Sequence, residues 1–303
     1  MSKDLNDPGA VLTGAKQTMA SWSKVIESYE TVPTIYKNIF ETQFPNNQQF
    51  PYTLLTPSLV KPGYKTNEKL VCDANDAIHI LERNGNQVTV KNYPYQKVYM
   101  VEAGSILLCS WLTISGILST GMADISTIDF NTANTRHFET FFNKLRPTPQ
   151  SIVGTKSKAE KDKFDYLSTL NFKLMNFGRS SLVCGETVIQ ILLQHEIRQP
   201  IWAMLGSIFL QTIAPAHLTI LTSHELILIQ DIAHGRKVQE PQYGGIWQYI
   251  PLHSIKAATW SETGNGWLTF SVKVTSNKII EKLFAVSSKP ELDQLCAKLQ
   301  QMT

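Results

Sequence analysis

The sequence predicts a mainly β protein of the α+β class, in which a strand-rich unit closed by one helix occurs twice. Residues 69–82 align with residues 217–230 at an offset of 148 (217 − 69). Further along the chain, an apolar stripe recurs at an offset of 154 (292 − 138). Its members are Phe138, Phe141, Phe142 and Leu145 in the first half and Leu292, Leu295, Cys296 and Leu299 in the second. Such a repeat predicts two similar domains.

A shorter match lies between these two segments. It pairs Ser105-Ile106 with Ser254-Ile255 and Trp111 with Trp260, at an offset of 149 (260 − 111). We interpret the two tryptophans as equivalent positions of the repeat. An equivalent aromatic in each unit favours a shared packing role over a shared ligand contact.

Length and composition agree with two globular domains. The chain has 303 residues, and 43% of them are hydrophobic, which is sufficient for two buried cores. The 28 Lys and Arg against 25 Asp and Glu leave a net charge of +3. This charge is too weak to indicate nucleic acid as a partner, or an anionic membrane as an obligate one.

The cysteines and the apolar segments exclude further classes. The four cysteines form no CxxC pair, so neither a disulfide nor a zinc site is predicted. Residues 1–10 are polar and lack the pattern of a secretory signal, so we expect a cytoplasmic protein. The apolar segment 201–221 contains Gln211, Pro215 and His217, which favours buried core or an interdomain contact over a membrane span.

The predicted organisation has four parts. They are an N-terminal helical extension over residues 1–45, a first domain over 46–147, an extended linker over 148–164 and a second domain over 165–303. The linker prediction rests on a run rich in Lys, Ser, Thr and Gly.

The extension is predicted to be helical over 14–40. The apolar residues there recur at helical spacing: Met19, Trp22, Val25, Ile26 and Tyr29. A short helix after Thr31 and Pro33 follows, and residues 43–49 form a loop. Because a lone helix of this length is marginal in water, we expect the stripe to dock either on a repeat of the same chain or on a second molecule. The short loop over 43–49 favours the first repeat of the same chain.

Strand patterns dominate both repeats. Asn84-Gly85 predicts a hairpin turn, and Ser115-Gly116 predicts another. The alternation over 267–274 predicts a strand with one buried face. Each repeat ends in an amphipathic helix, the second of them with a capping box formed by Ser288 and Glu291.

Three segments of the second repeat resemble bacterial pleckstrin-homology-like (PH-like) domains. They are residues 218–229 (LTILTSHELILI), 249–255 (YIPLHSI) and 288–292 (SKPEL). The first repeat is similar more weakly, with residues 97–101 standing for the second segment without its proline. The resemblance implies two antiparallel sandwich or barrel domains, each closed by a C-terminal helix. It implies no active site, and the superfold hosts lipid, peptide and protein binding.

No spacing in the chain predicts catalytic residues, a cofactor or a metal. His195-Glu196 and His224-Glu225 begin like a zinc-protease motif, but the second histidine is replaced by Gln199 and by Leu228. Gly264-Asn265-Gly266 lacks the third glycine of a dinucleotide loop and is typical of a hairpin turn.

Two sets of residues are candidate contacts. Tyr243 and Trp247 lie in a glycine-flanked segment that has no counterpart in the first repeat, which is typical of a protein or peptide contact. Lys61, Lys65 and Lys69 approximate the basic loop with which PH domains bind anionic lipid. The sequence therefore predicts a non-enzymatic binding or scaffold protein acting through protein contacts or self-association. A peripheral binder of anionic membranes and an enzyme with a dispersed site are the alternatives.

Overall fold

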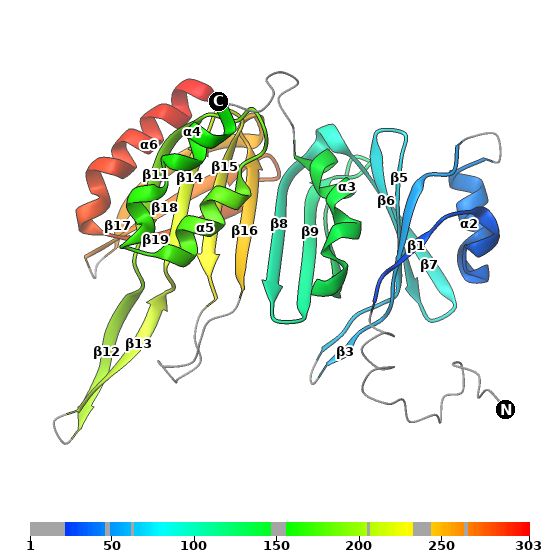
Figure 1. The fold of residues 1–303 in the computed structure, drawn as a ribbon, viewed down its shortest axis with the longest axis horizontal. Coiled ribbons are helices and arrows are strands. Elements are labelled where there is room, and N and C mark those ends of the chain that lie inside the picture. Colours follow the sequence, from blue (N-terminus) through cyan, green and yellow to red (C-terminus); the bar gives the residue numbers. More distant parts are fainter. Residues whose placement is uncertain are drawn as a thin grey trace. The chain divides into compact units, whose positions relative to one another are not determined.

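The protein is mainly β in its computed structural model, with several antiparallel sheets, few helices and a helix at the C-terminal end (Figure 1). The structure describes residues 22–45, 49–61, 64–146, 156–204, 207–232, 244–263 and 266–303. None of the described helices has the length and apolar character needed to cross a membrane. Contacts divide the chain into two units. Unit 1 holds the described residues up to Asn92 with Leu108–Ser110 and Ile128–Glu139, and unit 2 holds the remainder.

Unit 1 is built on a five-stranded sheet. Its strand order is β1 (Lys24–Ile26), β2 (Tyr52–Thr56), β5 (Lys69–Ala74), β6 (Ala77–Asn84) and β7 (Gln87–Pro94). A short ladder of β3 (Val60–Lys61) and β4 (Tyr64–Lys65) lies between β2 and β5 in the chain. Gly85 has φ +62° in the turn between β6 and β7, which confirms the hairpin predicted there.

The N-terminal prediction is wrong in part. Lys24–Ile26 is a strand paired antiparallel with β2, where a helix was expected, and Met19 lies outside the described residues. The stripe is short, and two of its residues, Val25 and Ile26, are β-branched, which favours a strand. Pairing with β2 gives their backbone groups the hydrogen bonds that a helix would otherwise supply. The helix that follows is confirmed as α2 (Thr34–Gln43), after the 3-10 turn η1 (Tyr29–Thr31).

This segment docks on the first repeat, as expected. Tyr36 and Phe40 of α2 are buried against Leu70 of β5 and Leu81 of β6. The Tyr36 hydroxyl donates to the Glu68 carbonyl over 3.2 Å. The N-terminal segment is therefore part of the core of unit 1.

Unit 2 contains a seven-stranded sheet to which both repeats contribute. The order is β10 (Ala123–Asn131), β9 (Cys109–Ile117), β8 (Val98–Ile106), β16 (Gly245–Pro251), β15 (Glu225–Asp231), β14 (His217–Thr222) and β11 (Val188–Gln194). Strand β8 lies beside β16 (Figure 1), and the two pair antiparallel. In this ladder Ala103 lies opposite Trp247. The first repeat thus lends three strands to a sheet of the second.

Two further sets of strands belong to unit 2. β12 (Ile197–Met204) and β13 (Ser207–Ala214) form a hairpin that projects from the sheet in Figure 1. β17 (Ile255–Thr263), β18 (Trp267–Val274) and β19 (Ile279–Ala285) form a three-stranded sheet. The alternation predicted for β18 is confirmed, because Leu268, Phe270, Val272 and Val274 are buried.

The helices of the second half pack on this framework. They are α4 (Lys156–Asp162), α5 (Phe172–Ser181) and the C-terminal α6 (Lys289–Met302). In α6 the predicted stripe is buried, and Pro290 lies in the first turn. The capping box predicted at Ser288 is wrong, because its side chain makes no cap hydrogen bond after the 3-10 turn η6 (Val286–Ser288).

The structure corrects the alignment of the two repeats. A 3-10 turn preceded by proline occurs in each, as η2 (Tyr95–Lys97) after Pro94 and η5 (Leu252–Ser254) after Pro251. The two prolines have φ, ψ of −57°, 131° and −54°, 136°. The offset in this region is therefore 157 (251 − 94), and the first repeat does contain the proline.

The equivalence of Trp111 and Trp260 is consequently wrong. Trp260 lies in β17, the first strand after η5, whereas Trp111 lies in β9, the second strand after η2. The closing helices do keep the offset of 154, since η3 (Thr132–Asn134) and α3 (Thr135–Leu145) correspond to η6 and α6. The match at Ser105-Ile106 was too short to fix a register.

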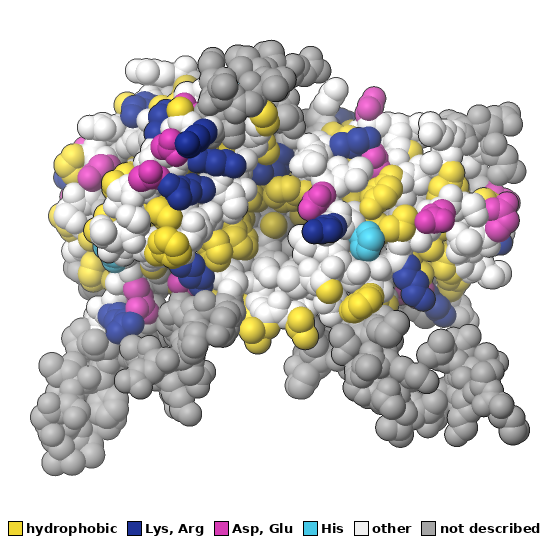
Figure 2. All heavy atoms as spheres, viewed as in Figure 1, with side chains coloured by type: hydrophobic (Ala, Val, Ile, Leu, Met, Phe, Trp, Pro, Cys, Tyr) yellow, Lys and Arg dark blue, Asp and Glu magenta, His cyan; other side chains and the backbone are white. Residues whose placement is uncertain are grey.

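Two loop predictions also change. Ser115-Gly116 lies inside β9, and the turn after β8 falls at Leu107, which has φ +53°. Gly116 is needed for close packing instead, because a Cβ there would lie 2.9 Å from the Tyr93 ring. The extended conformation expected for the linker is wrong over Lys156–Asp162, which is helix α4, and α5 was not predicted. Figure 2 shows basic and acidic side chains interspersed in the region of α4, whose sequence is KSKAEKD.

Truncation of the closing helices tests the packing. Phe141 and Leu295 are fully buried. Phe141→Ala and Leu295→Ala should each lower the free energy of unfolding by about 2 to 5 kcal/mol, because each leaves a cavity. Asn143→Ala and Gln301→Ala, at exposed positions of the same helices, are the controls for urea unfolding. Equal stability of Leu295→Ala and Gln301→Ala would contradict the assigned faces.

Candidate functional site

The predicted protein contact is only partly described. Tyr243 lies outside the described residues. Trp247 is half-buried in β16, and its ring centroid lies 4.7 Å from that of Phe177 in α5. Trp247 therefore packs α5 onto the sheet, and a role in protein contact stays a prediction.

The three lysines of the predicted lipid site differ in their surroundings. For Lys61 the structure describes the backbone in β3, and Lys65 in β4 is exposed. Lys69 is buried in unit 1, and its Nζ lies 3.5 Å from Glu82 Oε1. A lysine held in an interior ion pair is poorly placed to bind lipid, so this prediction rests on Lys61 and Lys65.

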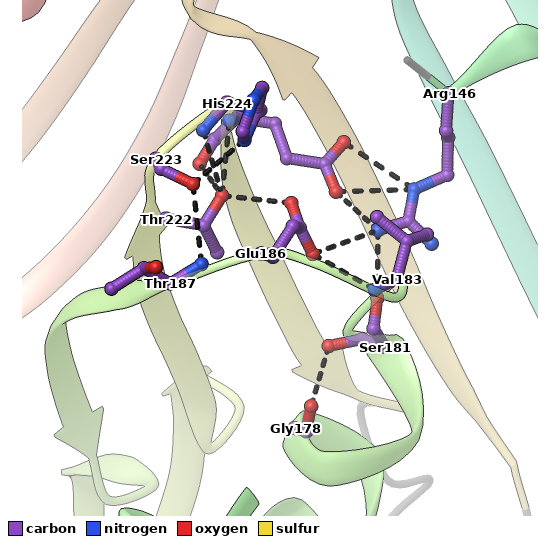
Figure 3. Close-up of polar contacts among 10 residues, drawn as sticks. Arg146, Gly178, Ser181, Val183, Glu186, Thr187, Thr222, Ser223 and His224 are labelled. Carbon is purple, nitrogen blue, oxygen red and sulfur yellow. Dashed lines mark hydrogen bonds and ion pairs between the residues drawn. The ribbon is translucent and has the colours of Figure 1, made fainter. Parts of the chain in front are cut away.

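A buried cluster of charged residues lies in unit 2 (Figure 3). Arg146, Glu186 and Glu225 are 4%, 3% and 2% exposed. The Arg146 guanidinium donates to both carboxylate oxygens of Glu225 and, over 2.7 Å, to the Ser181 carbonyl at the end of α5. It also stacks on Tyr249 of β16, 3.9 Å from the ring centroid.

Glu186 supplies the second carboxylate of the cluster. Glu186 accepts from the Thr222 hydroxyl over 2.9 Å and from the Val183 amide over 2.9 Å. Its Oε2 lies 3.9 Å from the Arg146 guanidinium. Two buried carboxylates thus share one arginine, and burial raises the pKa of Glu225 to about 7.

This cluster ties together the segment after α3, the end of α5 and the turn between β14 and β15. It is enclosed, and each of its groups has partners within the protein. We interpret it as a structural clamp rather than a ligand site.

A pocket of about 260 Å³ in unit 2 is the better candidate site. It lies between the start of β14, the end of β15 and strands β18 and β19. Its lining residues are Ile213, Ala214, Pro215, His217, Gln230, Thr269, Glu281, Lys282 and Leu283.

Three of these residues are polar at positions that face the core. Lys282 lies opposite Phe270 in the β18–β19 ladder, and its inward neighbours along β19 are the buried Ile280 and Phe284. His217 and Gln230 are direct partners in the β14–β15 ladder. Polar residues in a core row depart from the pattern that folding favours, and such departures are expected at functional sites.

His217 places a neutral imidazole in the wall of the pocket. It is 2% exposed, and burial lowers its pKa to about 4, so the ring is neutral at pH 7. Its Nδ1 lies 3.2 Å from the Pro215 carbonyl, which can only accept, and this assigns the ring proton to Nδ1. Nε2 therefore carries a lone pair, and it has no hydrogen-bond partner among the described residues.

Lys282 offers the pocket a cation. Its Nζ donates to Gln230 Oε1 over 2.6 Å, and among the described residues no further acceptor engages it. Burial lowers its pKa to about 8, and the Glu102 carboxylate on β8 acts in the opposite direction. The lysine is mostly charged at pH 7 but lacks a direct counter-ion.

Glu102 of β8 lies on the same face of the seven-stranded sheet as Gln230, beyond the ladder that joins β8 to β16. Trp111 Nε1 donates to Glu102 over 3.1 Å, and Gln248 Nε2 donates to it over 3.0 Å. The Trp111 ring lies over Gly104, where a Cβ would come within 2.0 Å of the ring. This arrangement holds the negative charge of Glu102 in place beside the pocket.

The pocket suits a group that accepts from Lys282, such as a carboxylate, and the lone pair of His217 Nε2 is buried in the wall beside it. Over the described part of the chain no group of three His, Cys, Asp or Glu could hold a metal ion. His224 instead bonds through Nδ1 to the Ser223 hydroxyl over 2.7 Å.

Sequence reasoning missed this pocket, although a signal exists. In β19 the apolar alternation Ile280, Phe284 is interrupted by Lys282, and in β15 the alternation Leu226, Leu228 ends at Gln230. A charged residue at a core-facing strand position marks a site of this kind. Comparison with family models and with curated proteins found no match, so the residues themselves carry the functional argument.

The clamp predicts a large loss of stability without its cation. Arg146→Met should lower the free energy of unfolding by about 3 to 5 kcal/mol, because it leaves buried carboxylates uncompensated. Arg136→Met, at an exposed position of α3, is the matched control in chemical unfolding. A loss no larger than that of the control would mean that the cluster does not hold unit 2 together.

His217 predicts a pH dependence. Because its pKa is near 6.5 when unfolded and about 4 when folded, the unfolded chain binds more protons between these values, and stability falls as pH drops through this window. The full effect is about 3 kcal/mol. Protonation of Glu225 has the opposite effect, because its pKa is raised in the folded protein: between about pH 4.5 and 7 it increases stability as the pH falls. The measurement is therefore the difference between the wild type and His217→Gln, which should lose stability less steeply from pH 6.5 to 4. Parallel curves would contradict the neutral histidine.

Proposed function

We propose that the chain is a non-enzymatic binding protein built from two PH-like repeats, whose second repeat binds an acidic peptide of a partner protein. The single observation that carries this proposal is the charged Lys282 in a core row beside the unpartnered Nε2 of His217. In support of PH-like repeats, a series of strands, a proline-led 3-10 turn, three more strands and a closing helix occur in the same order twice.

The chemistry of the pocket favours a peptide. An aspartate or glutamate carboxylate accepts from Lys282, and a backbone N–H donates to the Glu281 carboxylate. Ile213 and Leu283 add apolar surface at the pocket wall. At about 260 Å³ the pocket holds one or two side chains, and is smaller than a typical pocket for a drug-sized ligand.

The proposal names no reaction. A nucleophile needs a base within hydrogen-bond reach, and Lys282 bonds to the amide oxygen of Gln230, which is no base. Lys282 and His217 are therefore assigned to recognition. Lys282 supplies the charge that a carboxylate recognises, and the neutral His217 beside it adds no competing charge.

A pair of blocked amino acids tests this function. N-acetyl-aspartate N-methylamide should shift the backbone amide signals of His217, Gln230 and Lys282 in NMR titrations, and its neutral asparagine analogue should bind at least tenfold more weakly. Binding should weaken as the pH rises through about 8, because Lys282 loses its charge there.

Two variants serve as the controls of this titration. Lys282→Met should abolish the response, whereas Lys273→Met, which removes an exposed lysine from the neighbouring strand β18, should leave it unchanged. Equal binding of the two probes, or an unaltered response in Lys282→Met, would refute the proposed function.

A further inference from the structure

The joint between the two repeats uses one strand edge from each. In the second repeat it is β16, the strand before the turn η5, and in the first repeat it is β8, the strand after the turn η2. Their ladder runs from Gly245 opposite Ser105 to Tyr249 opposite Val101. The joint therefore links the strand before the turn in one repeat to the strand after the turn in the other.

Each of these two strand types occurs once in each repeat. The strand before the turn in the first repeat is β7, and the strand after the turn in the second repeat is β17. Among the described strands, β7 has only β6 as a hydrogen-bonded neighbour, and β17 has only β18. The joint within one chain therefore uses β16 and β8. The equivalent strands, β7 and β17, lie at the edges of two other sheets.

We propose that a second copy of this chain fills these edges, with β7 of one molecule pairing antiparallel with β17 of another. An edge strand presents a row of backbone donors and acceptors that another strand can pair with. The occupant is a second copy because the chain itself already demonstrates that these two strand types pair. This inference rests on the ladder and not on the proposed function.

The internal joint sets the register. Applying the offset of 157 to the β8–β16 ladder places Thr89 opposite Ser261 and Val90 opposite Trp260. The predicted pairs are Val88 with Glu262, Thr89 with Ser261, and Val90 with Trp260.

The residues in this register are compatible with pairing. No like charges face each other and no proline falls within either window. Val90 and Trp260 form an aromatic and β-branched pair, which is among the favourable cross-strand pairs. The irregularity of β17 between Ile255 and Ala257 lies outside the window.

Such a contact is head to tail. Because β7 and β17 are different strands, a pair of molecules still has one free β7 and one free β17. Contacts of this heterologous kind extend into open arrays unless the rotation between copies closes a ring. The binding pockets of the second repeats would then be presented in series.

Cysteine cross-linking tests the register directly. In a Cys109→Ser, Cys184→Ser background, Thr89→Cys protein mixed with Ser261→Cys protein should form a disulfide-linked dimer under mild oxidation. Residues directly opposite have Cβ atoms about 4.5 to 5.5 Å apart, close enough for a disulfide with little adjustment. Thr89→Cys mixed with Thr259→Cys is the matched control, because its Cβ atoms would be about 7 to 8 Å apart. Cross-linking in neither mixture, or equally in both, would overturn the proposal.

Sedimentation velocity provides an independent measurement without cysteine. The sedimentation coefficient of the wild type should rise from micromolar to millimolar concentration. Thr89→Lys with Ser261→Lys should suppress this rise, because like charges meet, and Thr89→Lys with Ser261→Glu should restore it. Thr89 and Ser261 are exposed, so all variants should melt like the wild type. A wild type that stays monomeric, or association unaffected by the lysine pair, would overturn the proposal.

Discussion

The backbone ladder between β8 and β16 is the interaction on which the rest of unit 2 depends. Residues that are 140 positions apart in the chain, Ser105 and Gly245, face each other in it. The ladder converts two short sets of strands into one sheet of seven. Without it, both β8 and β16 would expose unpaired backbone groups and the apolar rows beside them.

Side chains on both faces of the sheet reinforce this ladder. On one face Glu102 of β8 accepts from Gln248 of β16, directly opposite it. On the other face Tyr249 of β16 lies under the Arg146 guanidinium, with the Phe142 ring of α3 5.2 Å from its own. The segment that ends the first repeat is therefore anchored by charge in the interior of the second. Removing one partner of this buried ion pair would cost much stability, because the other charge would be left buried alone. The intact pair itself adds little net stability, because both charges have lost their hydration.

Local patterns in the sequence were sufficient for β18 and for the buried stripes of the closing helices. The alternation of β18 and the stripe of α6 follow from spacing alone, because each element buries one face. Local patterns did not give the alignment between the repeats. The match at Ser105-Ile106 and Trp111 arose by chance, whereas the equivalent position is the proline at 94, which precedes the 3-10 turn. Nor could the pairing of β8 with β16 be read from spacing, because a strand edge carries no mark of its partner.

The candidate site shows a similar division. Lys282 and Gln230 interrupt apolar alternations that are visible in the sequence, so their unusual placement could have been noticed. Their nearness to His217 depends on the β14–β15 and β18–β19 ladders and on how the two sheets meet. The lone pair on His217 Nε2 required a further fact, the contact of Nδ1 with the Pro215 carbonyl.

The long separation between β8 and β16 has a consequence for synthesis of the protein. Strands β8, β9 and β10 leave the ribosome well before the strand that completes their sheet, and translation of the intervening residues takes on the order of ten seconds at typical rates. During that interval the nascent chain displays an open edge at β8. We expect β8, β9 and β10 to complete their sheet only once most of the second repeat has emerged, so that folding does not proceed strictly from the N-terminus.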